Sequence, residues 1–228
     1  PEGGRPNLLF WDRAQFYIDN PAVAPSVLGP NYSQQINMGW SADHTIADPN
    51  DLCILATWFG RSQSGTSQDG GQTWTEFPAP PGGWQPAPGG SIACGSLTNV
   101  VVSQSNNSLP IYTTNGGSTW AAPSYTPSDC GVGAGYGFAY YVTNRFLFQD
   151  KATGYYYLYN ASCNGLGPRF MESTDSGATF TSVYSGEPAA NMNQQGRFYA
   201  TPGAAGDFWA TASWIGSPPP VTTALKRS

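Results

Sequence analysis

Charged residues are scarce in this sequence. Asp, Glu, Lys and Arg together make up 10% of its 228 residues, and the net charge is −5. Nine lysines and arginines are too few for the basic surface that nucleic acid or an anionic membrane attracts, so we expect neither partner. No apolar run approaches the roughly 18 residues of a membrane-spanning helix. No signal peptide is visible, so we expect a mature chain or a fragment.

Histidine and paired cysteine motifs are also lacking. The only histidine is His44, and no Ser or Cys motif beside it indicates a hydrolytic triad. A metal site built on His44 and Asp43 needs more ligands than the local sequence offers, and the absence of a C-x-x-C pair argues against zinc. We therefore expect no metal and no cofactor, and a hydrogen-bonded loop position for His44.

The four cysteines, Cys53, Cys94, Cys130 and Cys163, form an even set in a chain of low charge. We expect two disulfides, and we favour Cys53–Cys94 with Cys130–Cys163 among the three connectivities. Buried free thiols are the alternative. Three glycosylation sequons begin at Asn31, Asn106 and Asn160. Cysteines and sequons together predict a secreted, extracellular protein.

Glycine, proline and aromatic residues are plentiful, as in a turn-rich, all-β protein. One pattern, S/T-x-D/N-x-G-x-T-W/F, occurs three times, at residues 67–74, 113–120 and 173–180. Its Asp or Asn folds onto backbone N–H groups of a turn, its Gly takes angles that a side chain forbids, and its aromatic residue plugs the core. The pattern predicts hairpin turns and resembles the Asp-box of sialidase-like β-propellers. We expect Asp69, Asn115 and Asp175 to be structural.

The spacing of the three copies predicts a repeat. Their first residues, Ser67, Thr113 and Ser173, stand 46 and 60 residues apart. Ser228 has the place of a fourth first residue, so we expect the chain to start and stop inside the repeat. A period of roughly 40–50 residues is typical of propeller blades of four antiparallel strands. We predict an all-β fold, with residues 1–228 forming one partial β-propeller domain of about four blades.

The apolar runs predict strands, and we expect no helix. The run at residues 52–59 is continuously apolar, which indicates burial on both faces between stacked blades. Residues 146–150 and 154–159 predict a hairpin. Residues 19–35 and 78–90 are rich in proline and predict long surface loops, where function tends to lie.

Sorting the carboxylates leaves two candidates for chemistry. The other acidic residues lie in the repeated turns, in other turns, in the N-terminal tail or at expected exposed positions, which leaves Asp12 and Asp43. Asp12 stands between Trp11 and Phe16, and aromatic surroundings raise the pKa of a carboxyl group, which suits a general acid. A salt bridge or a turn is the alternative role for Asp12.

The order of several segments resembles the C-terminal propeller of the xyloglucan-cleaving glycoside hydrolases, the xyloglucanases and the reducing-end-specific oligoxyloglucan cellobiohydrolases. The resembling segments are residues 8–12, 39–43, 47–50, 89–93 and 198–209, with the three turn patterns between them. The turn patterns are shared by many propellers, whereas residues 89–93 and 199–209 are more specific. The resemblance implies two seven-bladed propellers around an open cleft, one of them partly represented by this chain.

The resemblance also implies roles for residues. By position, the family's general acid falls on Asp12, although Arg13 and Ala14 stand in a segment where the family has Gly-Asp-Ile-Gly-Gly-Phe. Asp43 falls on a residue that resembles a cleft carboxylate. The family inverts the sugar configuration, and its catalytic base comes from the N-terminal propeller, so a missing propeller half or a second chain would complete the site. The implied substrate is a polysaccharide, a β-glucan of the xyloglucan type.

Aromatic residues could stack against the sugars, with core packing between blades as the alternative for each tryptophan. The candidates are Trp11, Trp40, Trp58, Trp84 and Tyr32. Two other functions stay open. One is a non-catalytic propeller that binds an extracellular glycan or protein through the two long loops, and the other is a structural assembly component. A sialidase fits less well because no motif groups the arginines into a cluster.

Overall fold

In the computed structural model, the structure describes residues 7–9, 15–18, 20–24, 36, 38–58, 61–81, 89–105, 109–131, 145–160, 163, 169–184, 197–201, 204–211 and 225–227. Within these ranges the regular elements are strands and one short 3-10 helix, η1 (Ser128–Gly131), with no α-helix. The predicted all-β class is confirmed.

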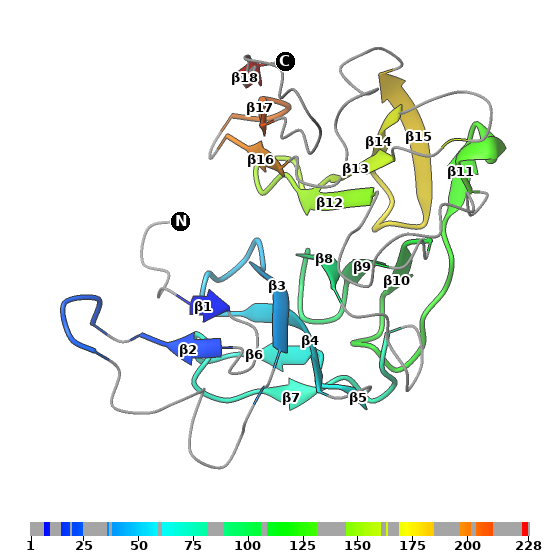
Figure 1. Cartoon of the computed structure of the whole chain (residues 1–228). Helices are drawn as coiled ribbons and strands as arrows, with labels where there is room; N and C mark the ends of the chain where they lie inside the picture. The colour runs from blue at the N-terminus through cyan, green and yellow to red at the C-terminus, as the bar shows by residue number, and fades with distance from the viewer. Residues whose placement is uncertain are drawn as a thin grey trace, which may run out of the picture.

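The described strands form five sheets, which we number in chain order (Figure 1). Sheet 1 pairs β1 (Asn7–Leu9) with β2 (Gln15–Tyr17). Sheet 2 contains β3 (Met38–His44), β4 (Leu52–Trp58), β5 (Arg61–Ser62), β6 (Gly65–Ser67) and β7 (Thr75–Glu76). Sheet 3 contains β8 (Gly90–Cys94), β9 (Val100–Gln104) and β10 (Ile111–Thr113).

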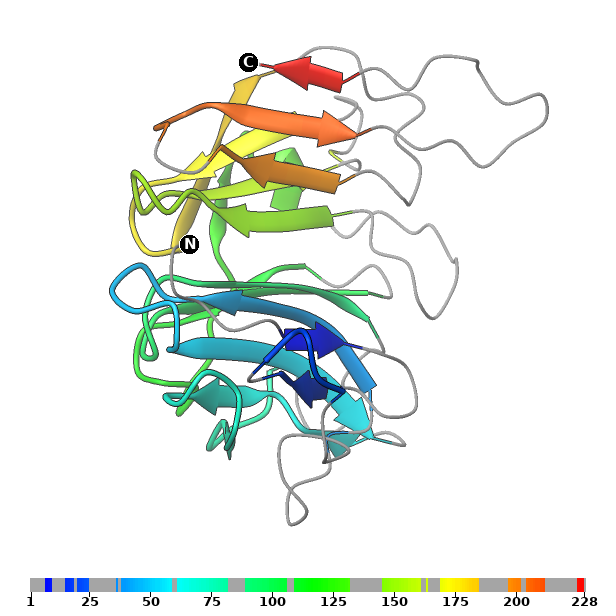
Figure 2. The ribbon, with the colours of Figure 1, turned by 90° about the vertical axis from the view of Figure 1, so that its left-hand side faces the viewer.

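Sheet 4 contains β11 (Ser124–Thr126), β12 (Arg145–Gln149), β13 (Tyr156–Asn160), β14 (Arg169–Ser173) and β15 (Thr179–Tyr184). Sheet 5 contains β16 (Arg197–Ala200), β17 (Phe208–Thr211) and β18 (Leu225–Arg227). The five small sheets follow one another along an arc in Figure 1, and Figure 2 shows them stacked face to face.

One edge strand of each of sheets 2 to 5 lies on the inner side of the arc, namely β3, β8, β12 and β16. Strand β3 contacts β8, β8 contacts β12, and β12 contacts β16, while β1 lies beside β3. From these strands the sheets extend outward through antiparallel ladders, and β11 is added in parallel at the outer edge of sheet 4. This radial arrangement of small antiparallel sheets is the one found in propellers.

Strand β4 is buried on both faces, as its continuous apolar sequence predicts. Leu52, Ile54 and Ala56 pack with Trp74 in one cluster. The alternate residues Cys53 and Leu55 pack in a second cluster that includes Phe77 and members of sheet 3. Because side chains alternate along a strand, a strand between two neighbouring layers must be apolar at every position.

The three repeated turns share one set of hydrogen bonds. In the first, the Ser67 hydroxyl donates to Asp69 Oδ1 at 2.8 Å, and the Thr73 amide donates to the same oxygen at 2.9 Å. The Gly71 amide donates to the Ser67 hydroxyl oxygen at 2.9 Å. The corresponding bonds recur in the second and third turns. One local sequence pattern therefore builds the same turn in sheets 2, 3 and 4.

Glycine is required in two of these turns because the neighbouring sheet comes close. Gly117 has a φ of 78°, and a Cβ atom there would lie 2.6 Å from Phe77 Cδ1. Gly177 has a φ of 88°, and a Cβ atom there would lie 2.5 Å from Val101 Cγ2. Both the backbone angle and the close approach exclude a side chain, so each turn packs directly onto the sheet before it.

The segment between sheets 3 and 4 covers the outer edge of sheet 4. Its strand β11 pairs in parallel with β15, with Ser124 opposite Thr179. Helix η1 follows, and Cys130 in this helix is bonded to Cys163. The second disulfide joins Cys53 to Cys94, so both pairings are those favoured by the sequence.

Aromatic side chains fill the contact between sheets 4 and 5. Phe208 of β17 lies with its ring centroid 4.5 Å from that of Tyr157 and 5.4 Å from that of Phe148. Phe170 stacks on Tyr157 at 5.5 Å. We call Phe148, Tyr157, Phe170 and Phe208 the aromatic cluster. The phenol of Tyr157 donates to Glu172 Oε2 at 2.7 Å, which gives this buried hydroxyl a partner.

Candidate functional site

Several predicted site residues lie outside the described residues. These are Asp12, Trp11, Tyr32, Trp84, Asn31 and Asn106. Trp58 and Asn160 occupy described strand positions, at the ends of β4 and β13. Among the candidate catalytic and sugar-stacking residues, Asp43 and Trp40 are those whose side chains the structure describes.

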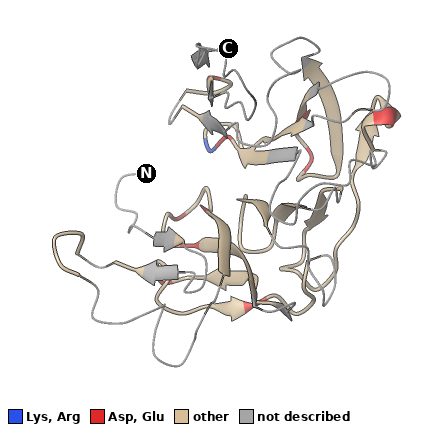
Figure 3. Cartoon of the chain, in the orientation of Figure 1, with Lys and Arg blue, Asp and Glu red and all other residues tan. Residues whose placement is uncertain are grey.

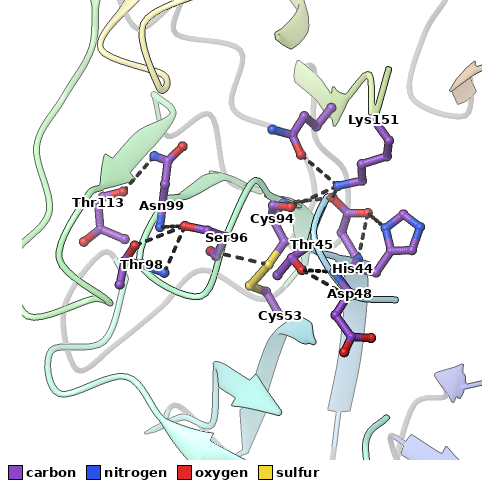
Figure 4. Close-up of a disulfide and its surroundings, with 12 residues drawn as sticks. His44, Thr45, Asp48, Cys53, Cys94, Ser96, Thr98, Asn99, Thr113 and Lys151 are labelled. Atoms are coloured by element: carbon purple, nitrogen blue, oxygen red, sulfur yellow. Dashed lines mark hydrogen bonds and ion pairs between the residues drawn. A yellow bond between two sulfur atoms is a disulfide. The ribbon is translucent and has the colours of Figure 1, made fainter. Parts of the chain in front are cut away.

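Asp43 is the penultimate residue of β3 and accepts hydrogen bonds through both carboxylate oxygens. The donors belong to His44, Cys94 and Lys151, which lie close together in Figure 4. Oδ2 accepts hydrogen bonds from the Cys94 amide at 2.8 Å and from Lys151 Nζ at 2.7 Å. Oδ1 accepts from the His44 amide at 2.9 Å. The side chain is 21% exposed. One carboxylate thus joins sheet 2 to sheet 3 and to the turn that follows β12 in sheet 4.

Lys151 completes this junction with three acceptors. Besides Asp43, its Nζ donates to the Cys94 carbonyl at 3.0 Å and to Gln149 Oε1 at 2.8 Å. Three N–H bonds are all that an ammonium group can donate. Lys151 is one of two lysines in the sequence, and its side chain is 25% exposed. We call Asp43, Cys94, Gln149 and Lys151 the polar junction.

The polar junction keeps Asp43 ionised. Burial alone raises the pKa of this carboxyl, but contact with His44, the charge and hydrogen bond of Lys151, and the Cys94 amide outweigh it, so the pKa lies below the usual 3.8. Burial lowers the pKa of Lys151, and the Asp43 carboxylate offsets part of that effect. A carboxyl group with a lowered pKa and hydrogen bonds to both oxygens is a poor proton donor near neutral pH.

His44 lies at the margin of the junction. Its Nδ1 is 3.6 Å from Asp43 Oδ1, beyond ordinary hydrogen-bond geometry. This buried nitrogen has no hydrogen-bond partner among the described residues. Within the described ranges, no group of three or more His, Cys, Asp or Glu side chains is placed to hold a metal ion.

The junction also explains how the inner strands satisfy their backbone amides. An inner strand has a ladder neighbour on its outer side only, and a buried N–H group without a partner is costly. The Ser41 hydroxyl accepts from the Ile92 amide at 3.3 Å, and the Ser91 hydroxyl accepts from the Leu147 amide at 3.1 Å. Asp43 does the same for Cys94. Side chains of one sheet thus supply hydrogen-bond acceptors to backbone amides of the next sheet, which have no ladder neighbour on the inner side.

Trp40 lies at a β-bulge in β3, where the register with β4 shifts between Gly39 and Ser41. A bulge re-aims the side chain of its extra residue. The indole Nε1 donates to Thr57 Oγ1 at 2.9 Å, and the half-buried ring packs against the cluster that contains Cys53 and Leu55. These contacts favour packing between sheets for Trp40, and a sugar-binding role stays a prediction.

Charged residues are sparse and scattered along the described part of the chain (Figure 3). The structure thus brings together Asp43 and Lys151, a pair that sequence reasoning missed. The two residues are 108 positions apart, and the only hint is a rare lysine in a hairpin turn.

The described part of the chain contains no helix with the length and apolarity needed to cross a membrane.

The chain is similar in sequence to a xyloglucanase, Xgh74A, of Acetivibrio thermocellus. The two share 26% identity over 217 residues, which cover 93% of this chain and 22% of that protein. The chain therefore spans about a fifth of the length of the curated relative. No family model matches the sequence.

Two solved structures of glycoside hydrolase family 74 (GH74) share the fold. The GH74 enzyme of Niastella koreensis superposes with a TM-score of 0.64 at 19% identity, over 95% of this chain and 29% of that one. The GH74 xyloglucanase of Xanthomonas campestris superposes with a TM-score of 0.65 at 22% identity, over 92% of this chain and 28% of that one. The chain thus resembles GH74 xyloglucanases in sequence and in architecture, as the ordered segments indicate.

Proposed function

We propose that residues 1–228 form part of a propeller in a secreted glycoside hydrolase that cleaves β-glucans of the xyloglucan type. The observation that carries this proposal is similarity to a xyloglucanase along 93% of the chain, together with an arc of small antiparallel sheets that fits two GH74 structures. The two disulfides support an oxidising, extracellular environment.

We propose that the arc represents about four blades of a seven-bladed ring. Sheets 2 to 5 would each be one blade, and the three repeated turns would be Asp-boxes, whose Asp69, Asn115 and Asp175 tie the outer strands. Because the chain spans about a fifth of its relative, the rest of the enzyme, from the same chain or a second one, would complete the ring and the cleft.

Asp12 is the proposed general acid. In an inverting reaction it would protonate the leaving glycosidic oxygen, while a base across the cleft removes a proton from water attacking the opposite face of the sugar. Such carboxyl pairs stand roughly 6.5–9.5 Å apart, which leaves room for the water. The base would come from the remainder of the enzyme.

The described contacts of Asp43 argue against Asp43 for this role, which leaves Asp12 as the proposed acid. An acid must carry a proton at the working pH, whereas the polar junction keeps Asp43 ionised. The strand before Asp12 is anchored, since Leu9 of β1 packs against the cluster of Ile54 and Trp74. Trp11, Trp58, Trp84 and Tyr32 are the proposed sugar-stacking residues, and Trp40 is the weakest of the set because its ring packs against the buried cluster that contains Cys53 and Leu55.

The test uses the full-length protein with xyloglucan as the substrate. Asp12→Asn should lower kcat by about 10²–10⁴-fold, because a general acid typically contributes that much. Asp69→Asn is the matched control. It makes the same carboxyl-to-amide change in the first repeated turn, and the second turn forms the corresponding hydrogen bond with the amide of Asn115. Release of reducing ends measures the rate, and NMR of the first-formed anomer reports inversion.

Unchanged hydrolysis by Asp12→Asn would refute its role as the acid. A wild-type protein that binds xyloglucan without cleaving it would refute the hydrolase and favour the non-catalytic, glycan-binding propeller.

A further inference from the structure

The three repeated turns differ at one chemically important position. The first and third have carboxylates, Asp69 and Asp175, while the second has the amide of Asn115. In all three turns, Oδ1 accepts from a hydroxyl two residues before it and from a backbone amide four residues after it. We call this set of donors the frame. In the second turn the frame surrounds an amide, whereas in the first and third turns it surrounds a carboxylate.

The frame suits a carboxylate. In the first turn, Asp69 Oδ2 also accepts from the Thr73 hydroxyl at 2.6 Å. Burial raises the pKa of Asp69, but the hydrogen bonds from Thr73 and Ser67 together outweigh it, so the pKa lies below its usual value. In the second turn, Asn115 Nδ2 must instead donate to the Thr119 hydroxyl oxygen, at 2.9 Å. A carboxylate at position 115 would only need the Thr119 hydroxyl proton to rotate toward it.

The residue after Asn115 makes this amide reactive. Asn115 precedes Gly116, and a glycine amide is the least hindered nucleophile that a following residue can offer. After losing its proton, the Gly116 nitrogen can attack Asn115 Cγ. The Cγ–Nδ2 bond then breaks, ammonia leaves, and a succinimide ring remains. Water opens the ring to aspartate or isoaspartate, so the net change is amide plus water to carboxylate plus ammonia.

The folded turn holds the reacting groups away from this path. The Gly116 amide donates to the Thr98 carbonyl at 3.0 Å, so the nucleophile is already engaged. The Asn115 side chain is held at both ends, by Thr119 through Nδ2 and by Thr113 and Thr119 through Oδ1. Asn115 is exposed at the surface, so opening of this turn alone would release both groups.

We propose that Asn115 is a deamidation site that is closed in the folded turn and reacts when the turn opens. The turn then accepts the aspartate product in the place that Asp69 and Asp175 hold in the other two turns. Isoaspartate adds a carbon atom to the backbone between positions 115 and 116, which breaks the spacing between Oδ1 and the Thr119 amide, so the turn does not accept it.

The first experiment compares deamidation in the native chain and in the chain unfolded in urea, at the same mildly alkaline pH. Peptide mapping by mass spectrometry follows Asn115. The other Asn–Gly pair of the sequence, Asn164–Gly165, lies outside the described residues and serves in urea as an internal clock with the same dipeptide. We expect Asn115 to match this clock in urea and to react about tenfold or more slowly in the native chain, because opening costs free energy.

Equal rates for Asn115 in the native and unfolded chains would overturn the proposal. The second experiment measures the product directly, by thermal unfolding of Asn115→Asp beside wild type and Asn115→Ala. We expect Asn115→Asp to melt at or above the wild-type temperature. We expect Asn115→Ala to melt below it, because alanine loses the hydrogen bonds that the Asn115 side chain makes with Thr113 and Thr119. An Asn115→Asp protein that melts as low as Asn115→Ala would show that the turn rejects the carboxylate and would also overturn the proposal.

Discussion

Two junctions in the same arc hold neighbouring sheets by opposite means. Sheets 2, 3 and 4 meet at the polar junction, where Asp43 and Lys151 are fully bonded beside the Cys53–Cys94 disulfide. Sheets 4 and 5 meet at the aromatic cluster, and the Gly206 amide donates to Asp150 Oδ2 at 3.1 Å nearby. The first junction depends on a few directed bonds, and the second on buried ring area.

This difference teaches where each junction is vulnerable. Directed bonds fix the position of one strand relative to another, but losing one partner leaves a charge in a partly buried site. Ring contacts tolerate small shifts and lose stability in proportion to the area removed. We therefore expect substitutions in the polar junction to loosen three sheets together, and substitutions in the aromatic cluster to loosen sheet 5 alone.

Removing the disulfide should have the largest effect. The bond links residues that are 41 positions apart, and a closed loop of that size contributes about 3–4 kcal/mol. We expect the double variant Cys53→Ala with Cys94→Ala to lose that much stability in urea unfolding. The same change at Cys130 and Cys163, which joins η1 to sheet 4, is the control for location. A Cys53–Cys94 loss that leaves amide exchange in β8 unchanged would contradict the shared junction.

Lys151→Met should have the next largest effect. It removes the ammonium group and leaves the Asp43 carboxylate with backbone donors alone, at a cost of about 2–3 kcal/mol for a pair with some solvent access. The double variant with Asp43→Asn should recover part of the loss, because no unpaired charge remains. Additive losses in this cycle would show that Asp43 and Lys151 are not coupled.

Phe208→Ala should follow, at about 2 kcal/mol for a partly exposed ring. Because the aromatic cluster joins sheet 5 to sheet 4, the loss should be local. Hydrogen exchange should rise in β16 and β17 and stay unchanged in β4 and β8. Faster exchange in all four strands would mean that the two junctions are not separate.

Acid should have the smallest effect. The folded pKa of Asp43 lies below 3.8, so the unfolded chain binds the proton more tightly, and stability from this group is complete above that pH and falls as the pH drops below it. Asp69 and Asp175 shift in the same direction, so the measurement is the difference between wild type and Asp43→Asn. That difference should shrink as the pH falls from neutral to below 3.8, because Asp43 then takes up its proton. A constant difference would contradict an ionised Asp43.

Local features of the fold could be predicted from the sequence. The continuous apolar run of β4 predicts burial on both faces, and the structure buries both. The repeated pattern predicts the turns at residues 67–74, 113–120 and 173–180, whose hydrogen bonds agree. Each of these signals is complete within about eight neighbouring residues, so no knowledge of distant contacts is needed.

Distant contacts could not be predicted in the same way. Sorting the carboxylates left Asp43 as a candidate for chemistry because its partner Lys151 lies on another sheet. Glu172 is one of the acidic residues for which the sequence predicts an exposed position, yet it is partly buried and accepts a hydrogen bond from Tyr157, which lies opposite it in the ladder. Nothing in the sequence near Trp40 reveals the bulge of β3. The assignment of Asp12 stays a prediction.

The parallel pairing of β11 with β15 has a consequence for the behaviour of the protein at high concentration. The rim of a β-sheet offers a row of open donors and acceptors that can template the addition of a foreign strand. Here strand β11, which belongs to the connecting segment, pairs with the edge strand β15. The disulfide between Cys130 and Cys163 holds this segment in place. Reduction of this bond would free the segment to lift away, and self-association along β15 would then become the expected route to aggregation.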